Sequence, residues 1–276
     1  MVAPADSSLG PGTYSTLLAG TPVYLYLPQN ILTQTNNTRP IQVIVALHGI
    51  NSSGQSFGAN LADFARQNQL IIVAPTFNYN LNWQDPQVIA AEDSRLAGQL
   101  NSIVNDLKKR IQPAQPDNRL LIYGFSRGAQ LAHRFALLYP ENMLGVAVQS
   151  AGSYTLPFTT SPDQSNVNVL PFPFGVSNLG IYWAGGFNNI SFRKIMFLVE
   201  VGAMDTNPTQ TPTAWDAYLG KGRVERATEF NHWLTVDGVN SRLIVVPGTG
   251  HTVNAATRAP VLQFFSGLLT QPALHC

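Results

Sequence analysis

The sequence predicts an α/β fold built on one mainly parallel sheet. Short apolar runs with the character of strands alternate with longer segments of helical periodicity. One of these runs, IQVIVAL at residues 41–47, is apolar almost without interruption, as expected for a strand that is covered on both faces. The 276 residues, of which 45% are hydrophobic, suffice for one large core. We therefore expect a single domain over residues 1–276.

The first half of the chain begins this alternation. Residues 23–27 and 41–47 are β-branched runs between Pro and Gly signals and predict strands. Phe57, Leu61 and Phe64 repeat at helical spacing, which predicts a helix over 56–67. The next expected elements are a strand at 70–74, a long helix at 88–111 with its apolar residues on one side, and a strand at 120–123.

The second half repeats the pattern around one long irregular segment. We expect a helix at 129–139 and strands at 145–149, 195–201 and 243–246, with a helix at the C-terminal end. Residues 153–193 are rich in Pro, Asn, Phe and Gly. A segment this long inside a compact domain is usually a lid or a binding loop, and aromatic residues are scarce in disordered chains. We predict a cap beside the active site.

The strongest local motif is Gly124-Phe-Ser126-Arg-Gly128, a G-x-S-x-G sequence between an expected strand and an expected helix. This context indicates a sharp turn that presents the Ser126 hydroxyl above the sheet, flanked by residues that must be small. Helix N-terminal N–H groups at such a turn favour developing negative charge. Ser126 is therefore the predicted nucleophile, whereas the alternative is an ordinary glycine-rich turn.

A serine nucleophile needs a base, and five histidines are candidates. His251 follows the last expected strand in the sequence PGTGH, at the carboxyl end where α/β folds build their sites. His48 belongs to another motif, and His133 lies within the helix after Ser126. His232 and His275 follow no strand. His251 is therefore the predicted general base.

The third member should be a carboxylate on a loop after a strand between the other two. Asp205 follows the strand IMFLVEV, and the order Ser126, Asp205, His251 is the order of this kind of fold. Glu200 lies within the strand and should point into the sheet or its cover, while Asp216 and Asp237 lie in or after the next helical region. A plain helix-capping role is the alternative for Asp205.

The strand at 41–47 runs into His48-Gly49-Ile50, where a glycine lets a backbone N–H face the reacting carbonyl. This loop predicts one half of an oxyanion hole, whereas the alternative is a plain glycine turn. The other half is the N–H of Arg127, the residue after the nucleophile.

Together the motifs ALHG, GFSRG, VGAMDTN and GTGH resemble the α/β-hydrolase superfamily, over residues 41–270. The short HGI loop and the acid in a D-T-N-P turn resemble the branch of polyhydroxybutyrate depolymerases and feruloyl esterases. This resemblance implies an α/β-hydrolase fold and assigns the first oxyanion N–H to Ile50. Bacterial cutinases and polyester hydrolases carry His or Trp before the serine, Met after it and a C-terminal disulfide. Phe125, Arg127 and the single cysteine argue against close kinship with that group.

Composition narrows the chemistry and the partners. The only cysteine is Cys276, so no internal disulfide, thiolate cluster or zinc cluster can form, and chemistry without a metal or cofactor is favoured. The net charge is +1 with no basic stripe, which disfavours nucleic acid as a partner. No apolar run reaches membrane-spanning length. We expect a monomer.

Localisation is predicted from the surface and from the N-terminal residues. Only 11% of the residues are charged, a balance typical of extracellular enzymes. Residues 1–12 lack a signal peptide and read as the trimmed start of a mature chain. We therefore expect a secreted protein.

The sequence thus predicts a serine esterase acting through an acyl-enzyme on apolar or aryl esters, with polyesters as further candidates. The expected substrate-binding residues are aromatic: Trp183, Phe172 and Phe174 from the cap, and Trp83 from another side. Core packing is the alternative for these residues. A serine peptidase on the same fold and a binding protein without catalysis are the other function classes.

Overall fold

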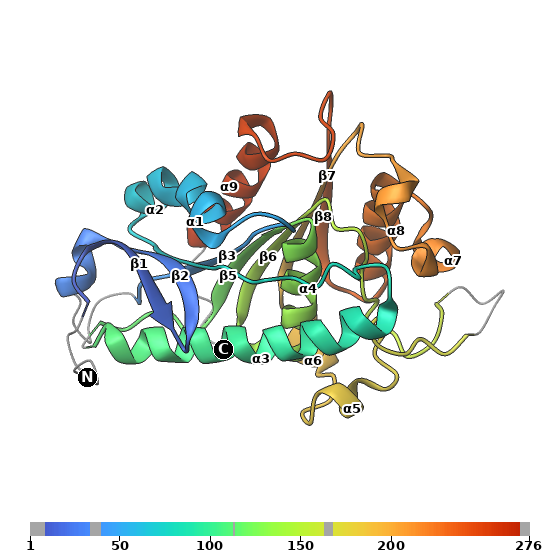
Figure 1. Ribbon diagram of the computed structural model, residues 1–276, viewed down its shortest axis with the longest axis horizontal. Helices are drawn as coiled ribbons and strands as arrows, with labels where there is room; N and C mark the ends of the chain where they lie inside the picture. Colours follow the sequence, from blue (N-terminus) through green and yellow to red (C-terminus); the bar gives the residue numbers. More distant parts are fainter. Residues whose placement is uncertain (1–8, 34–39, 113, 163–167, 271–276) are drawn as a thin grey trace.

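The computed structural model describes residues 9–33, 40–112, 114–162 and 168–270. Its centre is an eight-stranded sheet in the order β1-β2-β4-β3-β5-β6-β7-β8 (Figure 1). β1 (Gly12–Leu18) pairs antiparallel with β2 (Thr21–Leu27), and β2 pairs antiparallel with β4 (Ile71–Pro75). All other pairings are parallel, as the sequence predicts. The expectations for residues 1–8, His275 and Cys276 lie outside the described residues.

All seven expected strands are present. The parallel part consists of β3 (Val43–Leu47), β4, β5 (Leu120–Phe125), β6 (Met143–Gln149), β7 (Met196–Gly202) and β8 (Asn240–Val246). β1 is an additional strand that the sequence analysis missed. Its side chains alternate between half-buried and exposed because it lies at the edge of the sheet, so it lacks the continuous apolar signal of the central strands.

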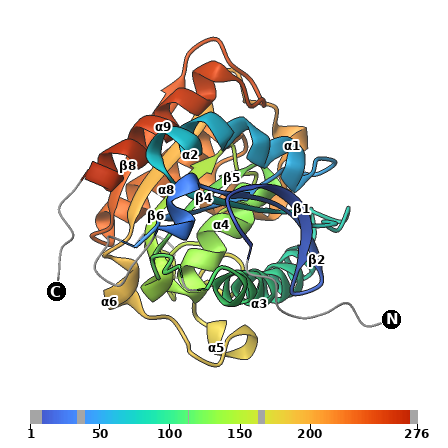
Figure 2. The same ribbon diagram turned by 90° about the vertical axis from the view of Figure 1, so that its left-hand side faces the viewer.

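Helices cover both faces of the sheet (Figure 2). Apolar side chains of α3 (Pro86–Arg110), α4 (Arg127–Leu138) and α8 (Arg223–Val236) pack on one face. The other face is covered by α1 (Gly54–Gly58), α2 (Ala62–Asn68) and α9 (Ala255–Thr270). The helix expected over 56–67 is therefore divided into α1 and α2, joined by the 3₁₀ turn η2 (Ala59–Leu61).

The remaining helical elements are short. They are η1 (Gln29–Leu32), η3 (Pro140–Asn142), α5 (Leu179–Tyr182), α6 (Asn189–Phe192), η4 (Pro208–Gln210), η5 (Thr213–Trp215) and α7 (Asp216–Leu219). Within the described ranges, no helix has both the length and the apolarity needed to cross a membrane.

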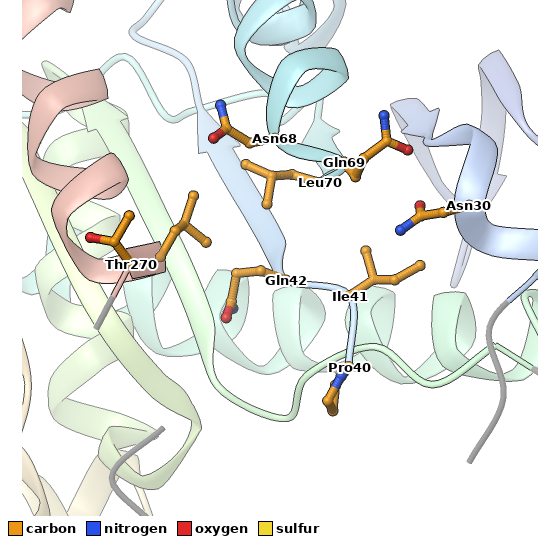
Figure 3. A pocket seen from close by; sticks show the side chains of 9 residues that line it. Asn30, Pro40, Ile41, Gln42, Asn68, Gln69, Leu70 and Thr270 are labelled. Atoms are coloured by element: carbon orange, nitrogen blue, oxygen red, sulfur yellow. The ribbon is translucent and has the colours of Figure 1, made fainter. Parts of the chain in front are cut away.

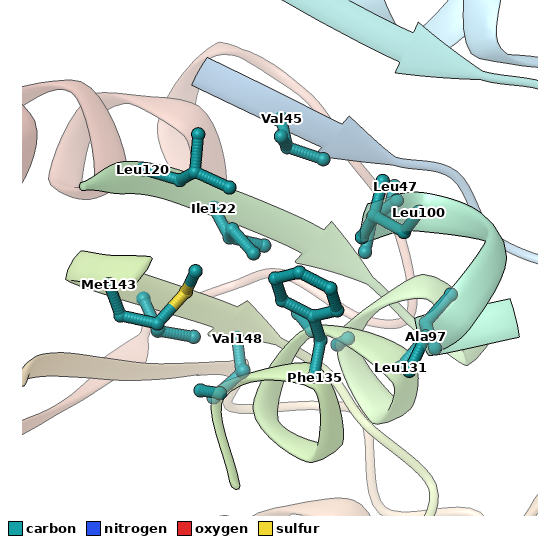
Figure 4. Packing of buried hydrophobic residues seen from close by; sticks show 14 of the residues in the cluster. Val45, Leu47, Ala97, Leu100, Leu120, Ile122, Leu131, Phe135, Met143 and Val148 are labelled. Carbon is teal, nitrogen blue, oxygen red and sulfur yellow. The ribbon is translucent and has the colours of Figure 1, made fainter. Parts of the chain in front are cut away.

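Tight packing fixes α4 against the sheet. Phe135 and Leu131 of α4 lie against Ile122 of β5 and Val148 of β6, with Leu100 of α3 beside them (Figure 4). Each of these side chains is fully buried, and burying such a side chain stabilises the fold by about 1.5–3 kcal/mol. Because α4 begins one residue after Ser126, this packing also fixes the position of the predicted nucleophile.

Candidate active site

Ser126 lies in the turn between β5 and α4, with φ 54° and ψ −116°. A positive φ is strained for a residue with a side chain, so the surrounding structure must hold it in place. One such restraint is the hydrogen bond from the Ser126 N–H to the Gln149 carbonyl, 2.9 Å long, on the neighbouring strand β6. The hydroxyl group consequently projects from the carboxyl edge of the sheet.

Two glycines make this turn possible. A Cβ on Gly124 would lie 2.3 Å from the Gly128 carbonyl oxygen, and a Cβ on Gly128 would lie 2.1 Å from the Leu47 carbonyl oxygen. Both distances are far below van der Waals contact with backbone atoms that cannot move away. A side chain at Gly124 would push β5 away from the start of α4, and a side chain at Gly128 would separate the turn from the end of β3. These clashes explain the small residues of the G-x-S-x-G motif.

His251 lies within hydrogen-bond distance of both other predicted catalytic residues. Its Nε2 is 3.0 Å from Ser126 Oγ, and its Nδ1 is 2.8 Å from Asp205 Oδ2. With the ring proton on Nδ1, the imidazole donates to the carboxylate and accepts from the serine hydroxyl. The structure thus brings together three residues that are separated by up to 125 positions in the chain.

Asp205 is held by a second buried partner besides His251. Its other oxygen, Oδ1, accepts a 3.0 Å hydrogen bond from Arg223 Nη1, and both side chains are almost completely buried. Burial opposes the charge on Asp205, but the hydrogen bond from His251 and the nearby Arg223 guanidinium outweigh it and lower the pKa of the carboxyl group. The carboxylate therefore stays ionised at neutral pH, as an acceptor for the histidine.

The loop that carries Asp205 is hydrogen-bonded through its backbone to the loop that carries His251. The Ala203 N–H donates to the Val246 carbonyl at 2.9 Å, and the Met204 N–H donates to the Thr249 carbonyl at 2.8 Å. Gly202 lies so close that a Cβ there would be 2.5 Å from the Thr249 and Gly250 carbonyl oxygens. These backbone contacts hold the loops of Asp205 and His251 together independently of the hydrogen bond between their side chains.

The predicted oxyanion loop also lies beside Ser126. A Cβ on Gly49 would be 3.3 Å from Ser126 Cβ, so the backbone of residues 48–50 passes close to the nucleophile. Arg127 is the first residue of α4, where an N–H has no acceptor within the helix. Ile50 thus follows a residue that lies against Ser126, and Arg127 directly follows Ser126 in the chain.

Two other histidines have structural hydrogen bonds instead. His48 Nδ1 lies 2.6 Å from the Gly49 carbonyl, and its Nε2 accepts from the Phe77 N–H at 3.1 Å. His133 makes the same pair of bonds, with the Ala129 carbonyl and the Thr155 N–H. Burial lowers the pKa of both imidazoles, so both rings are neutral with the proton on Nδ1.

The alternative acids lie elsewhere. Glu200 is fully buried in the layer between the sheet and α9, as the strand pattern predicts. Asp216 pairs with Arg226 at 2.6 Å, and Asp237 pairs with Arg193 at 2.9 Å. Asp205 is thus the carboxylate that the structure brings to His251.

The expected cap does not cover Ser126 with its aromatic residues. Trp183 packs on Tyr139, with ring centroids 4.4 Å apart, and Tyr139 follows the last residue of α4 whereas Ser126 precedes the first. The 12 residues of α4 span about 18 Å, so Trp183 lies at the far end of that helix. Figure 1 shows α5 at the edge of the sheet opposite to the loop that follows β8. The structure therefore does not bring Trp183 to Ser126.

The other two aromatic candidates from the cap, Phe172 and Phe174, line one pocket together with Asp85 and Gln87. Phe172 is 3% exposed and packs on Tyr182. Phe174 packs on Trp215 and Tyr218 at centroid distances of 4.6 and 5.3 Å. Neither contact connects the ring to Ser126. Trp83 is half-buried in the loop between β4 and α3, where its role stays a prediction.

A pocket at the amino ends of the parallel strands is separate from this site (Figure 3). Ile41 and Gln42 at the start of β3 line it, with Leu70 before β4 and Thr270 at the end of α9. Because Ser126, Asp205 and His251 follow the carboxyl ends of their strands, this pocket belongs to the opposite edge of the sheet.

Charged residues that the sequence did not predict lie behind the site. The Arg127 side chain is buried between Glu92 and Asp93 of α3, and Arg223 of α8 contacts Asp205. The sequence does contain one sign of a buried ion pair: Asp93 interrupts the apolar side of the long helix between Ile89 and Leu96. An acid at such a position requires a buried cation.

Residues 29–173, more than half of the chain, match the model of the phospholipase/carboxylesterase family. The chain belongs to this family of α/β-hydrolases, and it is a carboxylic ester hydrolase. Comparison with curated protein sequences gives no match.

Solved structures share the fold. A poly(aspartic acid) hydrolase-1 from Sphingomonas sp. KT-1 is similar over 92% of this chain and 98% of its own, with TM-score 0.67 and 17% identity. A poly(3-hydroxybutyrate) depolymerase from Bordetella parapertussis is similar over 90% and 84%, with TM-score 0.56 and 20% identity. A ferulic acid esterase is similar over 94% and 96%, with TM-score 0.58 and 15% identity. These similarities confirm the expected α/β-hydrolase fold.

Proposed function

We propose that this protein hydrolyses carboxylic esters through an acyl-enzyme on Ser126, with His251 as general base and Asp205 as the acid that orients it. The observation that carries the proposal is the continuous hydrogen-bonded series from Ser126 Oγ to His251 Nε2 and from His251 Nδ1 to Asp205 Oδ2. A serine hydroxyl is a weak nucleophile until a base in this position takes its proton.

The reaction has two steps. His251 Nε2 accepts the proton as Ser126 Oγ attacks the ester carbonyl carbon, and the same proton then passes to the oxygen of the leaving alcohol. Water repeats the sequence on the acyl-enzyme, giving up its proton to His251 and releasing the carboxylic acid. Asp205 stabilises the imidazolium in both steps because its lowered pKa keeps it ionised.

The backbone N–H groups of Ile50 and Arg127 would stabilise the negative charge that develops on the carbonyl oxygen. Support comes from Gly49, whose backbone passes against Ser126 Cβ, and from Arg127, whose N–H opens α4. Each such donor typically contributes about 2.7–4 kcal/mol to the transition state.

Solvent and substrate reach this site directly, since the His251 side chain is 27% exposed and Ser126 is half-buried. Phe125 packs on the His251 ring with a centroid distance of 4.8 Å and is itself half-buried. Together with half-buried Ile50, it gives the surroundings of Ser126 an apolar character. We therefore propose esters with apolar or aryl acyl groups as substrates, with feruloyl esters and polyesters as candidates to be compared. The low share of charged residues supports a secreted enzyme.

The test compares the wild type with Ser126→Ala on p-nitrophenyl acetate and on a peptide anilide. We expect ester turnover by the wild type and its loss in the variant, by roughly a millionfold as in comparable serine hydrolases, with an unchanged melting temperature. If Ser126→Ala retained more than about a tenth of the activity, Ser126 would not be the nucleophile.

The two substrates distinguish an esterase from a serine peptidase and from a binding protein without catalysis. Preferential cleavage of the anilide would indicate a serine peptidase, and turnover of neither substrate would indicate a binding protein. A series of p-nitrophenyl esters of increasing acyl length, extended to feruloyl esters and insoluble polyesters, measures the acyl preference.

A further inference from the structure

Arg127 has a side chain that is unusual for its place in the turn. It is 1% exposed, although it directly follows the half-buried Ser126. Its Nη2 lies 2.7 Å from Glu92 Oε2 and 2.6 Å from Asp93 Oδ1, two adjacent acids of α3. The residue that would supply an oxyanion N–H is therefore anchored by its side chain to a second helix.

The same side chain reaches the loop between β4 and α3. The Arg127 guanidinium carbon lies 5.2 Å from the centre of the Tyr79 ring. The neighbouring Asn80 N–H donates to Glu92 Oε1 at 2.7 Å, so one carboxylate holds both Arg127 and this loop. Glu92 thus connects the start of α4 to residues 79–80.

From Tyr79 the contacts continue to the other oxyanion donor. The Tyr79 and His48 rings lie 5.2 Å apart, and His48 Nε2 accepts the Phe77 N–H. His48 precedes Ile50 by two residues, and its Nδ1 bonds to the Gly49 carbonyl. Arg127 therefore contacts, through Tyr79, the loop that carries the second donor.

We propose that the Arg127 side chain, clamped by Glu92 and Asp93, is a positioning group that holds both oxyanion N–H donors at their distance from Ser126. This inference rests on the proposed function. Stability alone is a poor explanation for the arrangement, because replacing a buried ion pair by apolar residues is often neutral or stabilising. Two buried acids that hold Nη2 of Arg127, the residue after the nucleophile, act directly on transition-state geometry, where small displacements have large effects.

Arg134 is a matched control on the same helix. It is completely buried, and its Nη1 pairs with the other oxygen of Asp93 at 2.6 Å. Its Nε and Nη2 donate hydrogen bonds to Thr155 Oγ1 and Ser153 Oγ, respectively. Seven residues, or about 10 Å along α4, separate it from Arg127. Loss of Arg134 therefore removes a buried cation and one Asp93 ion pair without touching either donor.

The experiment compares Arg127→Met and Arg134→Met by kcat and KM on p-nitrophenyl acetate, by the inhibition constant of a boronic acid, and by thermal unfolding. A boronic acid forms a tetrahedral adduct with the serine and so reports on the oxyanion site. For Arg127→Met we expect kcat to fall about tenfold to a hundredfold, less than the loss of a whole donor, with boronate affinity falling in parallel and KM nearly unchanged. We expect the melting temperature to fall by a similar amount in both variants, because each loses a buried cation. For Arg134→Met we expect a kcat within about threefold of the wild type.

Three results overturn the inference: an unchanged kcat in Arg127→Met, an equal loss of kcat in Arg134→Met, or a loss of kcat without loss of boronate affinity. If Arg127→Met does not fold, Glu92→Gln provides the test. This change removes the charge of one of the two acids that hold Arg127 and keeps an acceptor for the Asn80 N–H. We then expect kcat to fall severalfold at constant KM, and an unchanged kcat overturns the inference. Full activity of Ser126→Ala would refute the proposed function, whereas inactive Ser126→Ala with fully active Arg127→Met refutes only the clamp.

Discussion

At the scale of single residues, neighbouring groups keep the Asp205 carboxylate in one ionisation state and one orientation. One of its oxygens faces His251 and the other faces Arg223. A carboxylate held at both oxygens cannot rotate away from the imidazole. The buried guanidinium also offsets the cost of burying the charge of Asp205.

The first prediction follows from this geometry. Asp205→Asn should lower kcat by about ten-thousandfold, because an amide in this place no longer favours the tautomer in which His251 accepts the serine proton. Asp216→Asn is the control, since its carboxylate pairs with Arg226, and it should stay near wild-type activity on p-nitrophenyl acetate. A severe loss in Asp216→Asn with little loss in Asp205→Asn would contradict the proposed acid.

At the scale of elements, α4 connects the site to the segment at 153–193. Ser126 precedes its first residue, and Tyr139, which follows its last, packs on Trp183. The first residues of the segment lie near the site, with Ser153 bonded to Gln130 of α4 at 3.0 Å. The chain then leads away to α5 and α6. Trp183 of this segment thus packs at the end of α4 distant from Ser126, whereas Tyr154 packs on Phe230 of α8 and Phe174 packs on Trp215.

The second prediction concerns Trp183. Trp183→Ala should lower the melting temperature, because the half-buried ring packs on Tyr139 and its loss leaves a cavity. The ratio of kcat/KM for long-chain or aryl esters to that for acetyl esters should stay within about twofold of the wild type, since the ring packs beyond the end of α4 opposite to Ser126. Kinetics on both ester classes, with a thermal scan, provide the check. A selective loss for bulky esters would restore Trp183 to the acyl pocket.

At the scale of the whole molecule, the parallel sheet determines where the chemistry lies. Strands β5, β7 and β8 end at the same edge, so the residues that follow them meet although they are far apart in the chain. Gln149 of β6 connects the turn that carries Ser126 to the loop that carries His251. Its backbone carbonyl accepts the Ser126 N–H, and its side-chain Nε2 donates to the Thr252 carbonyl at 2.9 Å, next to His251.

The third prediction concerns stability against pH. Glu200 is fully buried, and this burial raises its pKa to about 8. The unfolded chain loses the proton near pH 4.5 whereas the folded chain keeps it, so Glu200 lowers the free energy of unfolding as pH rises from about 5 to 8, by up to about 1.4 kcal/mol per pH unit. Above the folded pKa the loss is complete and no longer grows.

The test is the free energy of unfolding of Glu200→Gln, measured by denaturant titration at several pH values. Relative to the wild type, the variant should gain stability steadily between pH 5 and pH 8, because the amide does not ionise. Asp205 acts in the opposite direction, since its lowered pKa makes it stabilising above its unfolded pKa and its contribution is lost on acidification through the folded value. A constant difference between Glu200→Gln and wild type over that range would show that Glu200 does not titrate there.

The sequence by itself determined the class of the sheet and the three residues that the structure brings together. Continuous apolar runs and glycine-bounded turns are local signals, and both the positions of the strands along the chain and the position of Ser126, Asp205 and His251 after strand ends follow from them. The edge strand β1 escaped detection because only alternate side chains are half-buried.

Only the tertiary structure decided what lies behind and around that site. The clamp of Arg127 joins α4 to α3, Arg223 reaches Asp205 from α8, and Trp183 packs at the far end of α4. None of these contacts has a local signature in the chain. Their partners are chosen by the way helices pack on the sheet, and packing depends on the combined shape of many side chains that lie far apart in sequence.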